Sequence, residues 1–262
     1  MSSAFLNIAT KAAYLAGNTI QQGSRNLSNL KVQKKGHNDF VTDLDKKSEE
    51  IIVKTILQAF PEHNILGEEY GNLNKNSDYT WIIDPIDGTT NFVHGYPHYC
   101  ISIALKHKDK VTHGVILDPN RNDLYKAELG KGAYCNDKRI RVSSHSLEYS
   151  LVATGFPSYD MSIIDQYLTI FKEIILSTNG VRREGSAALD LAYVASGHID
   201  GFWEFNLKSW DIAAGILLVR EAGGIVIDFN GNQHNSNEGN IIAANSKIAN
   251  QLQKIIHNHH SK

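Results

Sequence analysis

The stretch Asp84-Pro85-Ile86-Asp87-Gly88-Thr89-Thr90-Asn91-Phe92 decides how the rest of this sequence is interpreted. It follows the apolar run 81–83, which predicts a short buried strand, so its two aspartates stand at a strand end. Carboxylate and carbonyl oxygens are the ligands that hard cations such as Mg²⁺ prefer. Pro85 stiffens the turn, which frees the Ile86 carbonyl to face the same ion, and Gly88 lets the backbone approach a ligand closely. The amides that follow would stand at a helix start, where phosphate binds well, so the stretch predicts a metal and phosphate site.

Two other interpretations account for less of this stretch. Aspartates with this spacing can simply cap helices or form turns, but that role leaves the following glycine and threonines unexplained. The haloacid-dehalogenase phosphatases carry a DxDGT signature, in which an acid stands two residues after the nucleophilic aspartate. Residue 86, two after Asp84, is Ile, so that acid is absent from its place.

Three further acidic segments are candidates for the same site. Gly67-Glu68-Glu69 follows the apolar pair 65–66, and neighbouring glutamates on a strand point to opposite faces, so at most one should reach a metal. Asp211 follows Trp210 at an expected helix start, where the helix dipole alone would favour a carboxylate. The segment 41–45 precedes a helix, and one of its two aspartates can be a simple cap.

The composition is that of an ordinary globular protein, with 262 residues, of which 42% are hydrophobic and 21% charged. Lys and Arg number 26 against 28 Asp and Glu, and this net charge of -2 argues against a dedicated nucleic-acid binder. Cys100 and Cys135 are expected to be free thiols. No apolar run approaches the roughly 18 residues of a spanning helix, and the N-terminus lacks a secretory pattern. We therefore expect a cytoplasmic protein without membrane contact.

Hydrophobic periodicity predicts a mixture of helices and strands without regular alternation, which favours α+β layers over a doubly wound sheet. An amphipathic helix is expected near the N-terminus, and 21–38 is expected to form a loop or loose hairpin. The other helices are expected at 43–60, 160–177, 186–196, 210–222 and 247–257. Strands are expected at 81–83, 100–106, 111–118, 124–128, 133–135, 201–205, 225–229 and 241–244.

These pieces resemble the inositol monophosphatase family over nearly the whole chain. Residues 84–92 match its first signature, and Trp210-Asp211-Ile212-Ala213-Ala214-Gly215 matches its second. The resemblance implies an α/β/α/β/α layered sandwich of the sugar-phosphatase (inositol monophosphatase/fructose bisphosphatase) type, usually a homodimer. It also implies a single domain over 1–262, with an N-terminal metal and phosphate half at about 1–145 and a C-terminal half at about 146–262.

The resemblance assigns roles by position. The residues implied to hold two or three Mg²⁺ ions are Glu68, Asp84, Ile86 through its carbonyl, Asp87 and Asp211. The catalytic residues implied are Glu68, Thr89, which would orient the attacking water, and its partner Asp45. The residues implied to contact substrate are Asp87, Gly88, Thr89, Gly185, Ser186, Ala187, Glu204 and Asp211. Lys34 resembles a lysine of the family's mobile metal-site loop.

The activity implied is hydrolysis of inositol 1-phosphate by direct attack of metal-activated water, with sensitivity to lithium. Fold relatives act on fructose 1,6-bisphosphate, 3′-phosphoadenosine 5′-phosphate, histidinol phosphate or NADP, and the metal residues cannot separate these substrates. Glu204, seven residues before Asp211, fits the inositol subgroup best. Some bacterial members also bind transcription or RNA-processing machinery, an alternative of another class that the net charge does not support. For Arg182 and Arg183 a solvated or interface role is expected before direct substrate contact.

Overall fold

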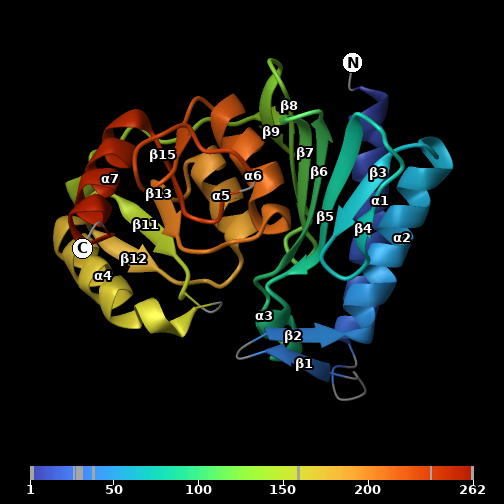
Figure 1. Cartoon of the computed structure of the whole chain (residues 1–262), viewed down its shortest axis with the longest axis horizontal. Coiled ribbons are helices and arrows are strands. Elements are labelled where there is room, and N and C mark those ends of the chain that lie inside the picture. The colour runs from blue at the N-terminus through green and yellow to red at the C-terminus, as the bar shows by residue number, and fades with distance from the viewer. Residues whose placement is uncertain are drawn as a thin grey trace.

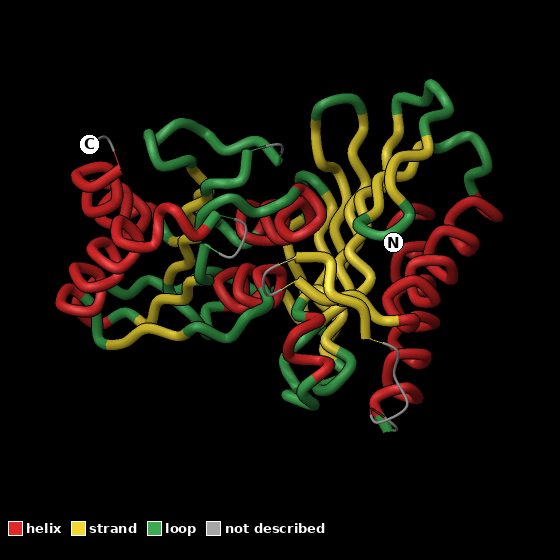
Figure 2. The backbone as a smooth tube through the Cα atoms, turned by 60° about the horizontal axis from the view of Figure 1, so that its bottom comes forward, coloured by secondary structure: helices red, strands yellow, loops and turns green. Residues whose placement is uncertain are grey.

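A computed structural model describes residues 3–25, 27, 32–36, 39–157, 160–236 and 238–260. The side chain of Lys34 lies outside this described part. The elements stack in the five layers that the resemblance implies, helices alternating with sheets (Figure 1). The turned view in Figure 2 again has helices between the two groups of strands. The expected α/β/α/β/α sandwich is therefore confirmed.

The helical layers owe their positions to apolar faces. The first layer holds α1 and α2, the middle layer α5 and α6, and the last layer α4 and α7 (Figure 1). Their bounds are α1 (Ala4–Ser24), α2 (Asp43–Ala59), α4 (Ile164–Ser177), α5 (Ala187–Ser196), α6 (Ser209–Glu221) and α7 (Ser246–His260). Helices α5 and α6 are buried almost all round, as a layer covered on both sides must be.

The larger sheet has eight strands in the order β10-β9-β8-β7-β6-β5-β3-β4. All neighbours are antiparallel except β3 and β5, which pair in parallel. Its strands are β3 (Asn64–Gly67), β4 (Gly71–Leu73), β5 (Tyr79–Asp87), β6 (Cys100–His107), β7 (Lys110–Asp118), β8 (Asp123–Glu128), β9 (Gly132–Cys135) and β10 (Lys138–Arg139). Because β3 and β5 run parallel, Glu68, which follows β3, and the two aspartates at the end of β5 lie at the same end of the sheet.

The smaller sheet has five strands in the order β12-β11-β13-β15-β14. Its strands are β11 (Leu151–Thr154), β12 (Gly180–Arg182), β13 (Gly201–Glu204), β14 (Ile225–Ile227) and β15 (Ile241–Ala244). Strand β11 pairs in parallel with both β12 and β13. The sequence did not predict β11 or β12, because their apolar runs are too short to give a period and their partners are distant in the chain.

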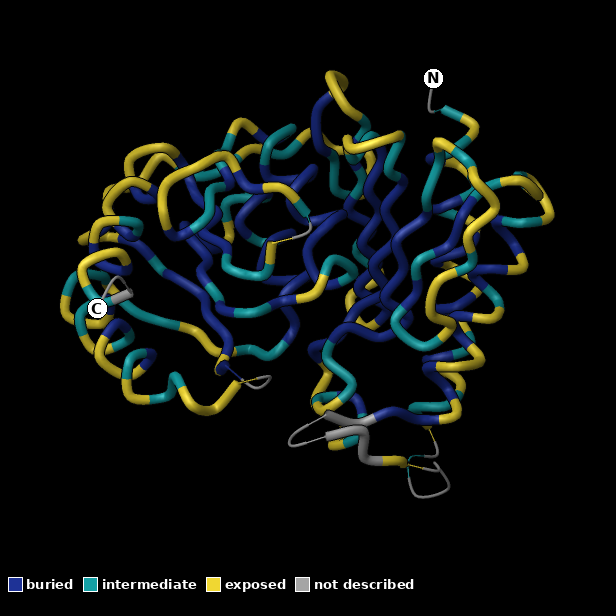
Figure 3. Tube along the Cα trace, viewed as in Figure 1, coloured by how far each residue is buried: buried dark blue, intermediate teal, exposed yellow. Residues whose placement is uncertain are grey.

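Buried apolar side chains form three clusters that correspond to the contacts between layers. The first joins α1 and α2 to the larger sheet, the second surrounds α5 and α6, and the third joins the smaller sheet to α4 and α7. Figure 3 shows the central strands of both sheets and much of the inner helices in the dark blue of buried residues. Trp203 is fully buried, and Trp210 packs against the middle cluster.

Most other expected elements are present with small shifts of their ends. The segment 21–38 contributes β1 (Val32–Gly36), which forms a hairpin with β2 (Asp39–Thr42). The helix expected from residue 160 starts with the short 3-10 helix η3 (Met161–Ile163), and another, η2 (Leu147–Tyr149), precedes β11. Among the described residues, no helix combines the length and the apolar character needed to cross a membrane.

Candidate active site

The two aspartates of β5 reach one face of the sheet through a β-bulge. Asp84 pairs with Ser102 of β6, but Asp87 pairs with Cys100, so three steps along β5 match two along β6. In a regular strand, residues three apart point to opposite faces. One extra residue in β5 cancels that alternation. Pro85, which has no N–H for the strand ladder, stands in the bulge. The bulge therefore turns an odd spacing into two carboxylates on one face.

A third carboxylate completes an acidic cluster. Asp84, Asp87 and Asp211 each offer a side-chain oxygen within 4.8 Å of the others, and within the described ranges they form the one such group of His, Cys, Asp or Glu. Asp211 lies in the first turn of α6 and accepts a 2.7 Å hydrogen bond from the Lys208 amide. The middle helical layer and the larger sheet thus meet at this cluster.

Burial and mutual repulsion perturb these carboxylates. Desolvation raises the pKa of Asp84 well above its usual range, and the charges of Glu68, Asp87 and Asp211 raise it further. Desolvation also raises the pKa of Asp87 to about 6, against hydrogen bonds that favour its charged form. Buried like charges of this kind are retained where a cation compensates them, and an all-oxygen donor set fits a hard ion such as Mg²⁺.

Glu68 and Glu69 lie in a turn after β3, where the sequence had suggested a strand. Alternation along a strand therefore does not decide which of them faces the cluster. The charge of Glu68 raises the pKa of Asp84 and Asp211, so Glu68 is near the acidic cluster, whereas the charge of Glu69 raises the pKa of Asp45. The turn is held by buried Glu49, which accepts a 3.3 Å hydrogen bond from the Glu69 amide. A Cβ at Gly67 would overlap the Glu49 carboxylate, so this contact needs glycine.

Thr89 and Asp45 form the hydroxyl–carboxylate pair that the resemblance implies. The Thr89 hydroxyl lies 3.0 Å from Asp45 Oδ1 and 2.9 Å from the Ile86 carbonyl oxygen, and its proton serves one of these acceptors at a time. Asp45 also caps α2: its other oxygen accepts the Thr42 amide at 2.8 Å. Desolvation raises the pKa of Asp45. The cap was the alternative role expected for this aspartate, and Asp45 combines it with the contact to Thr89.

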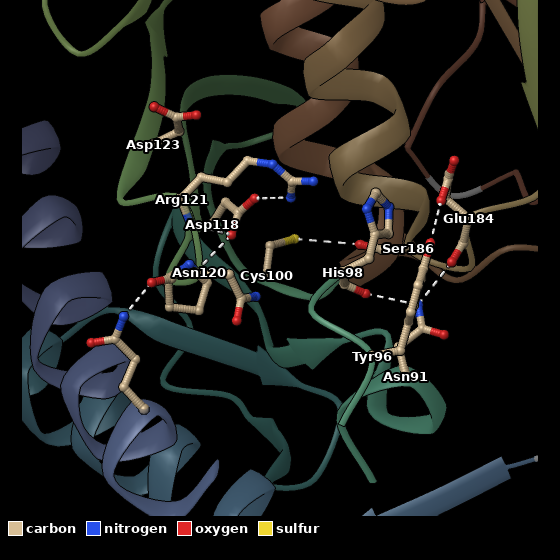
Figure 4. Close-up of polar contacts among 12 residues, drawn as sticks. Asn91, Tyr96, His98, Cys100, Asp118, Asn120, Arg121, Asp123, Glu184 and Ser186 are labelled. Carbon is tan, nitrogen blue, oxygen red and sulfur yellow. Dashed lines mark hydrogen bonds and ion pairs between the residues drawn. The ribbon is translucent and has the colours of Figure 1, made fainter. Parts of the chain in front are cut away.

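Gly88 occupies a position that only glycine fits well. Its φ of +97° is left-handed, and a Cβ there would lie 3.0 Å from the His98 carbonyl oxygen. The helix expected after it, α3 (Thr89–Val93), is a single short turn. Asn91 holds this turn in place: its amide nitrogen donates to the carbonyls of His98 at 2.7 Å and Glu184 at 2.8 Å (Figure 4).

The segment Gly185-Ser186-Ala187 comes from the other side of the molecule and meets the bulge. The Ser186 hydroxyl donates to Asp87 Oδ2 at 2.6 Å, and the Ala188 amide donates to the same oxygen at 2.7 Å. Ser186 also lies 3.7 Å from the buried sulfur of Cys100 (Figure 4). Ala187 opens α5, so the N-terminal end of that helix faces Asp87.

Glu204 ends β13 at the rim of this site. It is partly buried, and desolvation raises its pKa well above the usual range. A Cβ at Gly155 would overlap the Glu204 carboxylate, so the loop after β11 leaves room for it. Sequence inspection did not single out Gly155, Asn91 or Glu49, and for Gly155 and Glu49 no local motif marks the role.

Comparison with known proteins assigns the chain to a family. The model of the inositol monophosphatase family matches residues 1–261. A putative Nus factor SuhB of Neisseria meningitidis is 51% identical over 257 residues, covering 97% of this chain and 98% of that protein. The crystal structure of extragenic suppressor protein suhB from Bartonella henselae has a TM-score of 0.94 at 43% identity, covering 97% and 98% of the two chains. The Thermotoga maritima IMPase has a TM-score of 0.90 at 37% identity, covering 99% of each. The chain therefore belongs to the inositol monophosphatase family.

Proposed function

We propose that this protein is a Mg²⁺-dependent phosphomonoesterase that hydrolyses inositol 1-phosphate to inositol and phosphate in the cytoplasm. The observation that carries the proposal is the acidic cluster of Asp84, Asp87 and Asp211, which offer side-chain oxygens within 4.8 Å of one another where β5 meets α6. Membership of the inositol monophosphatase family supports the phosphatase chemistry.

Five groups would hold the metal, as two or three ions. They are the carboxylates of Glu68, Asp84, Asp87 and Asp211 and the carbonyl of Ile86. The Ile86 carbonyl accepts from Thr89 and keeps a second lone pair for a cation. When bound, Mg²⁺ supplies positive charge that neutralises a phosphate ester and lowers the pKa of water.

The chain's own groups orient the reactants. The Thr89 oxygen takes a proton from the attacking water as the hydroxyl proton of Thr89 passes to Asp45 Oδ1, 3.0 Å away. The backbone amides of Gly88 and Thr89 would bind the phosphate, because Gly88 carries no side chain to cover them. Glu204 accepts hydrogen bonds from the hydroxyl groups of the alcohol.

The first test is phosphate release from a panel of esters with and without Mg²⁺, and then with Li⁺. The panel contains inositol 1-phosphate, fructose 1,6-bisphosphate, 3′-phosphoadenosine 5′-phosphate, histidinol phosphate and NADP. We expect Mg²⁺-dependent release, preference for inositol 1-phosphate and inhibition by Li⁺. Preference for another ester would support the proposed phosphatase reaction but identify a different substrate. Failure to hydrolyse any ester would contradict the enzymatic proposal.

A second function is favoured by the name of a close relative. The Neisseria meningitidis protein, 51% identical over 97% of this chain, is called a putative Nus factor. We propose that this chain also contacts transcription machinery. A tagged wild-type protein and its Asp84→Asn variant should then retain the same transcription proteins from a lysate. Retention by neither would contradict this role, and sedimentation of the purified protein tests the proposed homodimer.

A further inference from the structure

The adjacent arginines Arg182 and Arg183 point to different places. Arg182 lines a cavity of about 370 Å³ together with Tyr96, His98 and Glu184. The Arg183 guanidinium instead lies over the Phe156 ring, 4.5 Å from its centroid. The sequence had suggested one solvated or interface role for both residues. The two side chains therefore lie in different places, and of the two only Arg183 approaches the rim of the candidate active site.

Two glycines locate Arg183 relative to that rim. A Cβ at Gly185 would lie 2.8 Å from Arg183 Nη1, so the guanidinium lies against the residue that precedes Ser186. Phe156, on which Arg183 stacks, directly follows Gly155, whose missing side chain makes room for the Glu204 carboxylate. Arg183 and Glu204 therefore both contact the Gly155–Phe156 loop. Arg183 and Asp87 both contact the Gly185–Ser186 segment.

Charge supports this placement. The positive charge of Arg183 lowers the pKa of Glu204, although desolvation by burial raises this pKa by more. It also lowers the pKa of Asp190, a fully buried neighbour on α5 that desolvation and Glu204 raise. A positive group thus faces two carboxylates on the alcohol side of the site. Within the described ranges Arg183 makes no hydrogen bond, so its N–H donors are available to a ligand.

We infer that Arg183 is a specificity-determining residue for the alcohol half of the substrate. Its guanidinium donates to hydroxyl oxygens of a polyol while Glu204 accepts hydrogen bonds from neighbouring hydroxyls of the same molecule. This inference rests on the proposed phosphatase function and adds a donor to the alcohol side.

The local charge balance decides which alcohol fits. The Arg183 guanidinium lies beside the carboxyl groups of Glu204 and Asp190, so this subsite is not a cluster of positive charge built for a second phosphate. A neutral polyol with adjacent hydroxyls can use both a planar donor and a carboxylate acceptor. The stack on Phe156 fixes the guanidinium plane before substrate arrives, so less side-chain entropy is lost on binding.

The test compares Arg183→Gln with Arg182→Gln, a matched loss of charge at the neighbouring exposed position. The substrates are inositol 1-phosphate and p-nitrophenyl phosphate, whose leaving group carries no hydroxyls. We expect Arg183→Gln to lower kcat/KM about tenfold for inositol 1-phosphate, mainly through KM, and less than about twofold for the aryl ester. Arg182→Gln should leave the ratio of the two kcat/KM values unchanged, and Arg183→Lys should recover part of the loss.

An unchanged ratio in Arg183→Gln would overturn the inference while the proposed function stands. An equal fall on both esters would also overturn it, since that pattern marks a structural or assembly role. Sedimentation and thermal melting of each variant identify that case. A wild-type protein that releases phosphate from neither ester would contradict the proposed function itself, and the inference with it.

Discussion

The Ser186 hydroxyl donates to Asp87 Oδ2 at 2.6 Å across 99 residues of sequence. The donor stands before α5 in the middle layer, and the acceptor stands in the bulge of β5 in the larger sheet. The Ala188 amide reaches the same oxygen at 2.7 Å. The Cys100 thiol also donates to this oxygen at 3.9 Å, so three donors converge on it and fix the orientation of the carboxylate. The geometry of the cluster thus depends on how two layers dock.

Replacing Ser186 by Ala should therefore weaken catalysis without removing any proposed metal ligand. Loss of a charge-assisted hydrogen bond of this kind costs about 1.5–3 kcal/mol, so kcat should fall at least about tenfold. Ser196→Ala, which removes a hydroxyl at the other end of α5, is the control and should behave as wild type. Wild-type kcat in Ser186→Ala would show that the orientation of Asp87 does not depend on this contact.

Asp84→Asn should remove both turnover and the response to Mg²⁺. Asp84 is buried and repelled by the carboxylates of Glu68, Asp87, Asp211 and Asp45, so a neutral amide relieves repulsion in the metal-free protein. We expect a melting temperature without Mg²⁺ that equals or exceeds that of wild type, no increase on adding Mg²⁺, and at least about 100-fold lower kcat. The exposed Asp109→Asn is the control. Retained activity would contradict the proposed metal site.

Thr89→Ala should separate orientation of water from metal binding. The variant loses the hydroxyl between Asp45 and the Ile86 carbonyl, and kcat should fall about 100-fold. Mg²⁺ should still raise the melting temperature, because the carboxylates are intact. Thr89→Ser should restore part of kcat, and the exposed Thr90→Ala should change little. Simultaneous loss of the Mg²⁺ response would assign Thr89 to the metal site instead.

Gly155→Ala should displace Glu204, because the new Cβ and the carboxylate cannot occupy the same space. KM for inositol 1-phosphate should rise about tenfold, while hydrolysis of p-nitrophenyl phosphate stays within about twofold of wild type. Glu204→Ala should give the same pattern. Gly180→Ala, in the same sheet, meets only an ordinary 3.5 Å contact and is the control. Equal losses on both esters in Glu204→Ala would mean that Glu204 does not recognise the alcohol.

His234 should make the protein less stable below neutral pH. The imidazole is 2% exposed, and desolvation lowers its pKa to about 4 from the ordinary 6.5. Because the unfolded chain takes up this proton first, stability falls as pH drops from 6.5 toward 4. The loss between pH 7.5 and pH 5 is about 2 kcal/mol. Denaturant unfolding at both pH values should show that the free energy of unfolding falls by this amount more in wild type than in His234→Gln. The exposed His94→Gln is the control and should behave as wild type. Equal pH dependence in wild type and His234→Gln would contradict this role of His234.

The sequence predicted the parts of the site that local motifs mark. The strings around Asp84 and Asp211 are such motifs, and the layered fold follows from the family they indicate. Contacts between distant segments were not predictable in this way. The fit of Gly155 to Glu204 and of Gly67 to Glu49 depends on tertiary packing alone. The parallel strands β11 and β12 were also not predicted from the sequence, because their pairing depends on partners far along the chain.

The bulge in β5 means that the site depends on the length of a segment as well as on residue identity. Removing one residue between Asp84 and Asp87 would restore regular pairing with β6 and keep both carboxylates on one face, because residues two apart in a strand share a face. The same deletion would shorten the backbone that presents the Ile86 carbonyl to Thr89. A shortened segment would therefore keep the sheet and the acidic pair but displace a backbone oxygen of the site.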